Sequence, residues 1–406
     1  MTLLHRLISW VPSGAASRAA SARLVLLLVA GIAVRIALVP ITRGQDFDVW
    51  DLASTATLHG SDIYTHHPAY PGGPYAYFPL FLYLELPLQF LAAHTGISFT
   101  VLGKVPILAG DVACALVLAA ELRDRTASNR AVLLGTSLFF LNPLVLYNGA
   151  FYGRFDTVAL ALLLFSVRLL RKRKRSAGLW YGLAVAAKTF PAFVLPGIVR
   201  YARGRRIWIA ITSMTVLLVL SAPYLPSWRA MLSDIVVYDA VKAPGALSWQ
   251  TLLLGTASIE ALRLISHVLL AGYLIGTVLL ARVLDLDLYI LATLVLFLVC
   301  TNVLLEQYLL WPMPWLVLVL FTAPRIRVAT IAFFVAATAV GMVANPHIQP
   351  WGRSPALIDA GFAIMSVIYL VTLVVHARRR NSAPALQPND AKSASSGGAT
   401  ADNVAA

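Results

Sequence analysis

Long apolar stretches separated by short polar segments recur along almost the whole of this chain. They fall at residues 23–40, 99–122, 131–147, 156–170, 207–224, 262–281, 286–304, 307–322, 328–345 and 357–376. A stretch of about twenty apolar residues matches the ~30 Å hydrocarbon core of a bilayer. Only 12% of the residues are charged, whereas soluble domains are about a quarter charged. The chain is therefore predicted to be an all-α, polytopic membrane protein.

Basic residues gather in loops between these stretches. The clusters lie around residues 123–130, 168–175, 200–206, 325–327 and 378–380. Because cytoplasmic loops of membrane proteins are rich in Lys and Arg, this pattern places these loops and both termini in the cytoplasm. The net charge of +14 is thus a topology signal, and no nucleic acid is expected as a partner. Cys114 and Cys300 fall inside apolar stretches, which argues against a disulfide framework or a cysteine metal site.

Two further apolar stretches do not fit a simple crossing. Residues 78–93 contain Glu85 and Pro87, and a full crossing there would move the RKRKR loop at 171–175 to the outer side, against the positive-inside rule. We expect a juxtamembrane or re-entrant helix instead. Residues 178–199 have basic clusters at both ends and a break at Phe190-Pro191, which predicts a hairpin of two short helices with Lys188 near the break.

The domain organisation follows from these stretches. Residues 1–380 are predicted to form a transmembrane helix bundle of about twelve membrane segments. Its long first outer loop, at residues 41–98, carries the juxtamembrane helices. Residues 381–406 are rich in Ala, Ser, Gly and Asn and cannot bury an apolar core, so they are predicted to form a disordered cytoplasmic tail.

An acidic cluster follows the first apolar stretch directly. Asp46, Asp48 and Asp51 lie within six residues of one another, in a chain with only 18 acidic residues. Acidic groups at a membrane face are costly, and a carboxylate is the kind of group that deprotonates an acceptor hydroxyl in glycosyl transfer. Paired carboxylates also suit hard divalent cations. The simpler interpretation is a solvated loop, with Asp51 on an amphipathic helix over residues 49–59.

The predicted topology brings further polar residues to the same outer end. They are His66, His67, Tyr75 and Tyr77 in the first outer loop, Lys104 and Asp111 in the next stretch, Arg154 and Asp156 near a short loop at 148–155, Lys188, then Glu306, Gln307 and Tyr308, and finally His347 and Arg353.

Each of these residues also has a simpler interpretation. Lys104 and Asp111 share a helix face and could form a structural ion pair, the histidines could be solvated, and Arg154 could extend toward the interface. A lysine within an apolar hairpin needs an anionic partner, which favours an anion-binding role for Lys188. Together the residues predict a site that takes an anionic ligand and holds a base.

Seven short motifs occur in order along most of the chain. They are GQDFDVW at 44–50, HGSDIY at 59–64, YAYFPL at 75–80, LGKVPILAGD at 102–111, YGRFDT at 152–157, GLAVAAKTFP at 182–191 and EQYLLWPMP at 306–314. This series resembles the GT-C class of integral-membrane glycosyltransferases and, more narrowly, glycosyltransferase family 87, with similarity to the GPI mannosyltransferase I family. The chain departs from related enzymes at Gln307, where a histidine is frequent.

The resemblance implies a hexosyltransferase. Its donor would be a polyprenyl-phosphate sugar, most simply mannose, and its acceptor a lipid-linked glycan on the outer face of the cytoplasmic membrane. Because a phosphate leaves without a general acid, one base is enough for an inverting single displacement. That base is assigned to Asp46, with Asp48 as the second choice, since the motif does not distinguish the two.

The same resemblance implies roles for the other polar residues. Lys188, and secondarily Arg154 and Lys104, would bind the donor phosphate. Apolar grooves between the spans would take the prenyl chain. No cofactor is required for such a transfer, although a divalent cation at Asp46 and Asp48 stays open. The residues expected to contact sugar or acceptor hydroxyls are Asp156, Gln307, Tyr308, His66, His67, Tyr77 and His347.

The main alternative is a multi-pass lipid or sugar transporter or flippase, and a non-catalytic assembly subunit is a third. Transporters often show inverted repeats and broken helices at the midplane. This sequence shows no internal repeat, has no nucleotide-binding motif, and gathers its polar residues at one end, which favours the enzyme. Mannose, arabinofuranose and glucose stay open as the transferred sugar.

Overall fold

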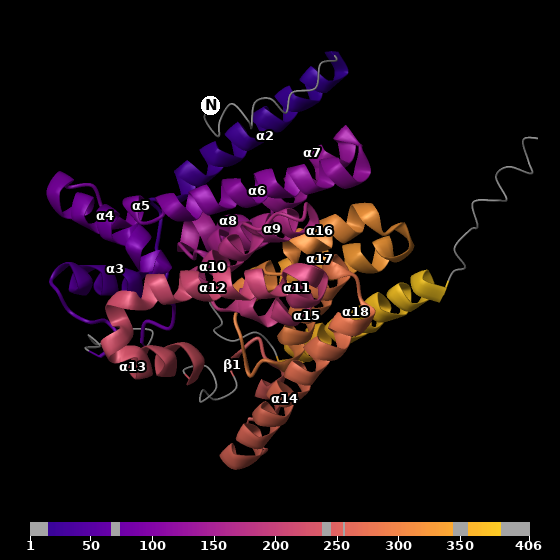
Figure 1. The fold of residues 1–406 in the computed structure, drawn as a ribbon. Helices are drawn as coiled ribbons and strands as arrows, with labels where there is room; N and C mark the ends of the chain where they lie inside the picture. The colour runs from indigo at the N-terminus through magenta and orange to yellow at the C-terminus, as the bar shows by residue number, and fades with distance from the viewer. Residues whose placement is uncertain (1–14, 66–73, 238–244, 255, 344–355, 383–406) are drawn as a thin grey trace, which may run out of the picture.

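The computed structural model describes residues 15–65, 74–237, 245–254, 256–343 and 356–382, and this part of the chain is almost entirely helical (Figure 1). The first half contains α2 (Ala15–Leu38), α3 (Gln45–Leu58), α4 (Leu80–Thr95), α5 (Phe99–Leu102), α6 (Val105–Thr126), α7 (Asn129–Phe140), α8 (Pro143–Leu146), the π-helical turn η1 (Tyr147–Tyr152), α9 (Asp156–Arg171), α10 (Ala177–Ala187), the 3-10 turn η2 (Phe190–Val194) and α11 (Leu195–Ala202). The predicted all-helical fold class is confirmed.

The second half continues in the same manner. It contains the turn η3 (Arg203–Arg205), α12 (Arg206–Ser221), η4 (Ala222–Ser227), α13 (Trp228–Leu232), η5 (Ser233–Val237), η6 (Trp249–Leu253), α14 (Ile259–Val283), α15 (Leu286–Cys300), η7 (Glu306–Leu310), α16 (Met313–Thr322), η8 (Pro324–Ile326), α17 (Arg327–Val343) and α18 (Ala356–Ser382). Two short parallel strands, β1 (Gly245–Ala246) and β2 (Val303–Leu304), pair with each other.

The centre of the bundle is built from helices that approach closely. α9 packs against both α6 and α10, and α10 packs against α12. Gly178 and Gly182 allow the last contact, since a Cβ atom at either position would lie 2.8 Å from a Cα atom, that of Ile209 or Ser213 respectively, on α12. Small residues serve this purpose in membrane helices, where close van der Waals packing drives association. These buried helices carry the segments that form the site.

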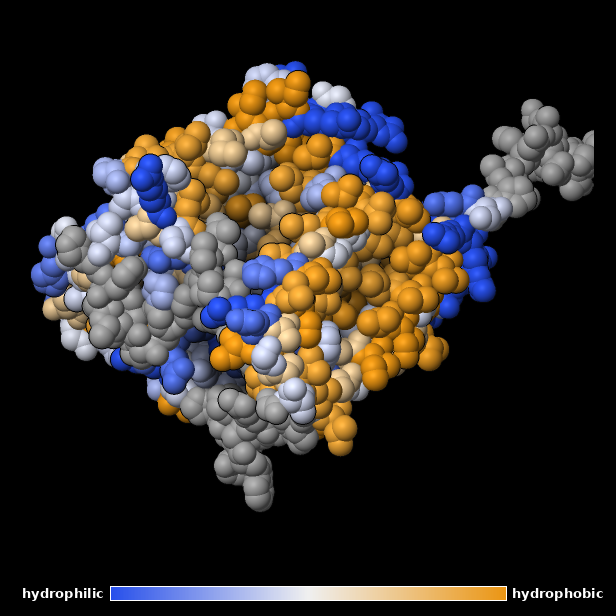
Figure 2. Space-filling view, turned by 90° about the horizontal axis from the view of Figure 1, so that it is seen from below, coloured by the Kyte–Doolittle hydropathy of each residue, from blue (hydrophilic) through white to orange (hydrophobic). Residues whose placement is uncertain are grey.

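Large apolar side chains cover the outside of the bundle. Leu26 on α2, Ile207 on α12 and Val328 on α17 are 68%, 74% and 81% exposed. Figure 2 shows apolar residues over much of one face, with hydrophilic residues gathered where α18 ends. A surface of this kind suits contact with lipid tails. The chain is therefore a multi-pass membrane protein, as predicted.

Fewer helices are long and apolar enough to cross a membrane than the sequence predicted. Six helices of the described residues are long and apolar enough to cross a membrane, or seven if α7 and the segment Pro143–Tyr152, bent by 47°, form one span. The remaining apolar stretches became short helices such as α10 and α15, which can stay at membrane depth because the surrounding protein covers them. About twelve segments therefore stays a prediction.

The two apolar stretches that did not fit a simple crossing are helical, as predicted. Residues 78–93 contain α4, which has Pro87 inside it; its juxtamembrane position stays a prediction. Residues 178–199 form two short helices, α10 and α11, with the break at Lys188, whose backbone is extended (φ −153°, ψ 147°). The predicted break beside Lys188 is confirmed.

Two segments that we expected to be loops are helical. α3 begins at Gln45 rather than at residue 49, which puts Asp46 and Asp48 in its first turn, where the helix dipole favours negative charge. The expected loop at 148–155 is mostly the π-helical turn η1. His66, His67, His347 and the predicted tail from residue 383 onward lie outside the described residues.

Candidate active site

Arg154 is the centre of the first group of polar side chains. Its guanidinium is buried, and Nε donates a hydrogen bond to Asp46 Oδ2 at 3.1 Å. Nη1 donates to Glu306 Oε1 at 2.7 Å and to Asn148 Oδ1 at 3.1 Å. The guanidinium also lies 4.3 Å from the centre of the Tyr152 ring. One cation thus joins α3, η1, η7 and the start of α9.

Two glycines allow these segments to meet. The backbone N–H of Gly44 donates to the carbonyl of Tyr152 at 2.8 Å, and a Cβ atom on Gly44 would overlap the Tyr152 ring. Gly153 has a φ of 87°, a left-handed conformation that glycine adopts without strain. It ends η1 and turns the chain so that Arg154 faces Asp46.

The two carboxylates around Arg154 differ in their access to solvent. Burial opposes the positive charge of Arg154, but Glu306 and Asp46 outweigh it and raise the pKa of Arg154 above its usual value. The Glu306 side chain is only 8% exposed, whereas that of Asp46 is 32% exposed. Asp46 is therefore the carboxylate of this group that a substrate hydroxyl can reach.

Lys188 forms a second group directly beside the first. Its Nζ donates to Asp156 Oδ1 at 2.8 Å, and Nε1 of Trp311 donates to the same oxygen at 2.6 Å. The ammonium also lies 5.1 Å and 5.6 Å from the ring centres of Phe155 and Tyr77. Because Asp156 comes two residues after Arg154, the same short segment contributes to both groups. The anionic partner of Lys188 in the structure is Asp156, and its predicted role in binding an anionic ligand stays a prediction.

Buried oxygen atoms without a hydrogen-bond donor surround this second group. Oδ2 of Asp156 and Oε1 of Gln307 are both buried and have no partner within the described part of the chain. An unsatisfied buried acceptor costs about 1–3 kcal/mol. The two atoms are thus placed to accept hydrogen bonds from a bound hydroxyl. Tyr308, next to Gln307, is buried with its ring centre 4.4 Å from that of Trp311.

Asp48 belongs to a different network from Asp46. Nε of Arg43 lies 2.9 Å from Asp48 Oδ1, and Nη1 of Arg43 lies 2.8 Å from Asp51 Oδ2. Gln89 on α4 donates to Asp51 at 3.0 Å. The two candidate bases therefore stand beside two different arginines. No three His, Cys, Asp or Glu side chains of the described ranges gather where they could hold a metal ion.

Lys104 donates its hydrogen bonds to backbone carbonyl groups of the protein itself. Its Nζ lies 2.5–3.0 Å from the carbonyl oxygens of Val39, Thr42, Ala150 and Phe151. An ammonium has three protons, so this arrangement leaves none for a phosphate. The Lys104–Asp111 ion pair that the sequence left open is not formed, because Asp111 pairs with Arg35 at 2.6 Å.

Asn148, Trp311 and Arg35 were missed from the sequence, and Glu306 was expected at this end of the bundle without an assigned role. Glu306 and Asn148 accept hydrogen bonds from Arg154, Trp311 donates one to Asp156, and Arg35 forms an ion pair with Asp111. An arginine inside the first apolar stretch was the available signal for Arg35, since a charge at that depth needs a partner.

Glu85 on α4 was recognised only as an interruption of an apolar stretch. It is fully buried, and neither of its carboxyl oxygens has a hydrogen-bond partner among the residues described. Burial raises the pKa of Glu85 well above its usual value, and Asp51 raises it further. Burial thus favours the protonated form of this carboxyl over its ionised form.

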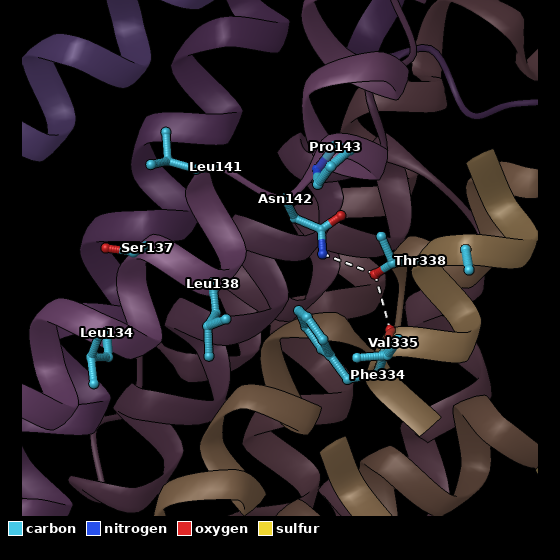
Figure 3. Close-up of a pocket in the computed structure, with 10 residues that line it drawn as sticks. Leu134, Ser137, Leu138, Leu141, Asn142, Pro143, Phe334, Val335 and Thr338 are labelled. Carbon is cyan, nitrogen blue, oxygen red and sulfur yellow. Dashed lines mark hydrogen bonds between the residues drawn. The ribbon is translucent and has the colours of Figure 1, made fainter. Parts of the chain in front are cut away.

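An apolar groove of about 440 Å³ lies between α7 and α17. At its inner side Nδ2 of Asn142 donates to Thr338 Oγ1 at 3.0 Å, and Thr338 in turn donates to the carbonyl of Phe334 (Figure 3). Beyond Asn142 the chain continues through α8 and η1 to Arg154. The groove and the site are thus carried by consecutive segments of the chain. Its other lining residues include Leu134, Leu138, Leu141, Pro143 and Val335.

Comparisons with known proteins identify the family of this chain. The model of glycosyltransferase family 87 matches residues 75–306, more than half of the chain, and this segment holds Arg154, Asp156 and Lys188. GPI mannosyltransferase 1 of Saccharomyces cerevisiae is 28% identical over 130 residues, 32% of this chain and 30% of that protein. Its counterpart in Debaryomyces hansenii is 21% identical over 141 residues, 34% of each chain. The chain thus spans about a third of the length of these curated relatives.

A solved structure shows the same fold. ArnT from Cupriavidus metallidurans, bound to undecaprenyl phosphate, superimposes with a TM-score of 0.50 at 14% identity, over 87% of this chain and 77% of ArnT. The fold is that of ArnT, a GT-C glycosyltransferase, and the family match includes Arg154, Asp156 and Lys188 but not Asp46. The chain therefore belongs to glycosyltransferase family 87.

Proposed function

We propose that this protein transfers a hexose, mannose above other sugars, from a polyprenyl phosphate to a lipid-linked glycan on the outer face of the cytoplasmic membrane. The observation that carries the proposal is the accessible Asp46 carboxylate on the buried Arg154, close in the chain to Asp156, which pairs with the buried Lys188. The names of the relatives support the two substrates: the curated relatives are GPI mannosyltransferases, and the ArnT structure holds undecaprenyl phosphate.

Asp46 is the proposed base. As the acceptor oxygen attacks C1 of the sugar from the face opposite the phosphate, Asp46 takes the hydroxyl proton and the bond between C1 and the phosphate oxygen breaks. The products are the glycosylated acceptor with inverted configuration and the free polyprenyl phosphate. Arg154 donates a hydrogen bond to Asp46 at 3.1 Å and so orients the carboxylate, which favours proton transfer in the bound complex.

The two cations are the proposed partners of the donor phosphate. Lys188 donates one of its three protons to Asp156, and the others would serve the phosphate as negative charge develops on it. Because the Lys188 side chain is only 6% exposed, the phosphate reaches it when covering side chains such as Tyr77 move. Lys104, held by four carbonyls, takes no part in this step.

The sugar would lie against the unsatisfied acceptors. Oδ2 of Asp156 and Oε1 of Gln307 would accept hydrogen bonds from its hydroxyls, with Tyr308 and Tyr77 at the edges. The contacts proposed for His66, His67 and His347 lie outside the described residues and stay predictions. No step of the proposal is assigned to a divalent cation.

The groove between α7 and α17 is the proposed place of the prenyl chain. Its walls are apolar, it lies on the lipid-facing side, and its closed end leads through α8 and η1 to Arg154. A chain bound there would bring its phosphate toward the site without leaving the hydrocarbon layer. Leu138→Trp would fill this groove and is expected to raise the KM for the prenyl donor, with little change for a donor whose prenyl chain is short.

The decisive test is a transfer assay with purified protein in lipid vesicles. Polyprenyl-phosphate mannose, glucose and arabinofuranose are offered separately with a mannosylated lipid acceptor, and GDP-mannose serves as the control donor. We expect product from the mannose donor, an inverted anomeric centre by NMR, and none from the nucleotide sugar. Product from another prenyl-linked sugar would correct the sugar alone, and retention of configuration would overturn the single displacement.

A further inference from the structure

A second pocket, of about 760 Å³, lies at the end of the bundle opposite the proposed active site. Its walls include residues near the ends of α6, α9 and α18. α6 begins one residue after Lys104 and runs for 22 residues to Thr126, roughly 33 Å at 1.5 Å per residue. That length matches the ~30 Å hydrocarbon core of a bilayer. The pocket therefore opens at the opposite membrane face, near the end of α18 in Figure 1.

Interlocked ion pairs build one wall of this pocket. Nη1 of Arg125 lies 2.6 Å from Asp287 Oδ2, and Nη1 of Arg171 lies 2.8 Å from Glu121 Oε2. Arg125 also pairs with Glu121, and Arg171 with Asp287. Both arginines are therefore fixed by two carboxylates each. A wall fixed in this way is preorganised, so a ligand would not have to order it.

The pocket keeps an excess of positive charge after these pairs are counted. Four arginines and two aspartates line it, and Glu121 pairs with two of the arginines, which leaves a net charge of +1 with His376 neutral. Arg380 is paired with Asp285 at 3.0 Å. Arg325, in η8, has no carboxylate partner in the described part of the chain and is exposed. The Arg325 guanidinium interacts electrostatically with His376, which lines the same pocket. A bound anion would balance this excess positive charge.

The rest of the lining is mainly apolar, with Tyr201 and Thr322 as the exceptions. Leu286, Leu288 and Val319 line the pocket beside the arginines. A volume of about 760 Å³ falls in the ordinary range for small-molecule sites, about 300–1,000 Å³. A ligand that matches both surfaces carries a phosphate next to a hydrocarbon chain. Basic pockets between membrane helices on the cytoplasmic side bind such lipid head groups, and the surplus of basic loops marks this end as cytoplasmic.

We propose that this pocket binds the phosphate head group of an anionic phospholipid, with Arg325 as the ligand at its mouth and Arg125 and Arg171 as its fixed wall. The site is separate from the transfer site and does not depend on the sugar or acceptor that the enzyme uses. A lipid held here would tie α6, α9 and α18 together at the face where the chain carries its basic loops.

Binding to the full-length protein in a neutral detergent tests this proposal. Native mass spectrometry compares phosphatidylglycerol, phosphatidylcholine and inorganic phosphate at equal concentration, without donor or acceptor. We expect phosphatidylglycerol to bind most tightly. Arg325→Gln is expected to weaken its binding about fivefold, the equivalent of the ~1 kcal/mol that one basic side chain contributes near an anionic lipid. Because Arg325 is exposed and holds no carboxylate, this variant is expected to fold.

Arg130→Gln is the matched control. Arg130 is exposed in the first turn of α7, at the same end of the bundle but outside the pocket, so its loss should leave lipid binding unchanged. Equal losses in the two variants, or equal binding of the two phospholipids, would overturn the proposal. Inorganic phosphate that binds as tightly as phosphatidylglycerol, with the same loss in Arg325→Gln, would support a phosphate site but overturn the lipid as its source. Neither result bears on the transfer reaction.

Discussion

The two buried cations of the active site use the same chemistry but differ in access. Arg154 is shared between Glu306 and Asp46, and the Asp46 side chain is 32% exposed. Lys188 and Asp156 are only 6% and 1% exposed, and Trp311 closes the pair. An ion pair hidden this deeply has a large desolvation penalty that only good geometry offsets. The first group is thus open for proton transfer, whereas the second must open before it can bind a phosphate.

Asp46→Asn should produce the largest effect, because it removes the only accessible carboxylate of the Arg154 group. An amide cannot take the acceptor proton, so transfer should fall about 10²–10⁴-fold, the usual contribution of a general base. The fold should persist, since Arg154 keeps Glu306 and Asn148. The turnover rate in vesicles at saturating donor measures the effect.

Asp51→Asn is the matched control for this change, on the same helix and beside Arg43. Its transfer rate should stay close to that of the wild type. Loss of transfer in Asp48→Asn with activity retained in Asp46→Asn would move the base to the Arg43 group and reverse the comparison between the two candidates.

Lys188→Met tests the closed group. It leaves Asp156 buried and charged without a cation, which is expected to cost about 3–5 kcal/mol of stability. The double variant Lys188→Met/Asp156→Asn should recover most of that loss, because the amide still accepts from Trp311 while no charge stays buried. Thermal unfolding in detergent measures both. Transfer should stay low in the double variant, and a double variant as active as the wild type would remove Lys188 from the mechanism.

The sequence was most informative where a helix is long and uninterrupted. The stretch predicted at 156–170 is α9, Asp156–Arg171, because its apolar positions and its charged ends agree. The stretch predicted at 99–122 is broken before Val105. That break places Lys104 among carbonyls that follow α2 and carbonyls of η1, a tertiary requirement that the local pattern does not contain.

The polar motifs predicted which side chains gather at the site but not how they pair. Asp46, Arg154, Asp156 and Lys188 do lie in two adjacent groups, as their shared end of the bundle predicted. Their partners depend on which helices are neighbours. Glu306 reaches Arg154 from 152 residues away, a separation at which one sequence gives no signal. Ion pairs of this kind come from packing, so they appear only in the structure.

Glu85→Gln sharpens the comparison with a buried carboxyl that has no cation at all. Because burial and Asp51 raise the folded-state pKa of Glu85, the folded protein binds more protons than the unfolded chain above the ordinary glutamate pKa. The free energy of unfolding should therefore fall as pH rises above about 4.5, by at most ~1.4 kcal/mol per pH unit.

Glutamine is neutral and nearly isosteric, so Glu85→Gln should lose this contribution to the pH dependence. Unfolding temperatures measured at several pH values for both proteins check it. The variant should gain stability over the wild type toward alkaline pH, where the wild-type carboxyl is forced to ionise. Parallel pH profiles would show that Glu85 finds a cation or solvent in the folded protein, as Asp46 does.

Arg43→Gln should have the smallest effect and completes the comparison. Arg43 pairs with Asp48 and Asp51 at the surface, where the side chains of Arg43 and Asp48 are 39% and 33% exposed. Exposed ion pairs contribute about 0–1 kcal/mol, so the unfolding temperature should change little. The pH dependence of transfer discriminates further. If Asp46 is the base, the profile of Arg43→Gln should match the wild type, because Asp46 pairs with Arg154 and Arg43 pairs with Asp48 and Asp51. A profile whose acid limb moves to higher pH would mean that Arg43 had been holding the catalytic carboxylate ionised, which is the behaviour expected of Asp48 as the base.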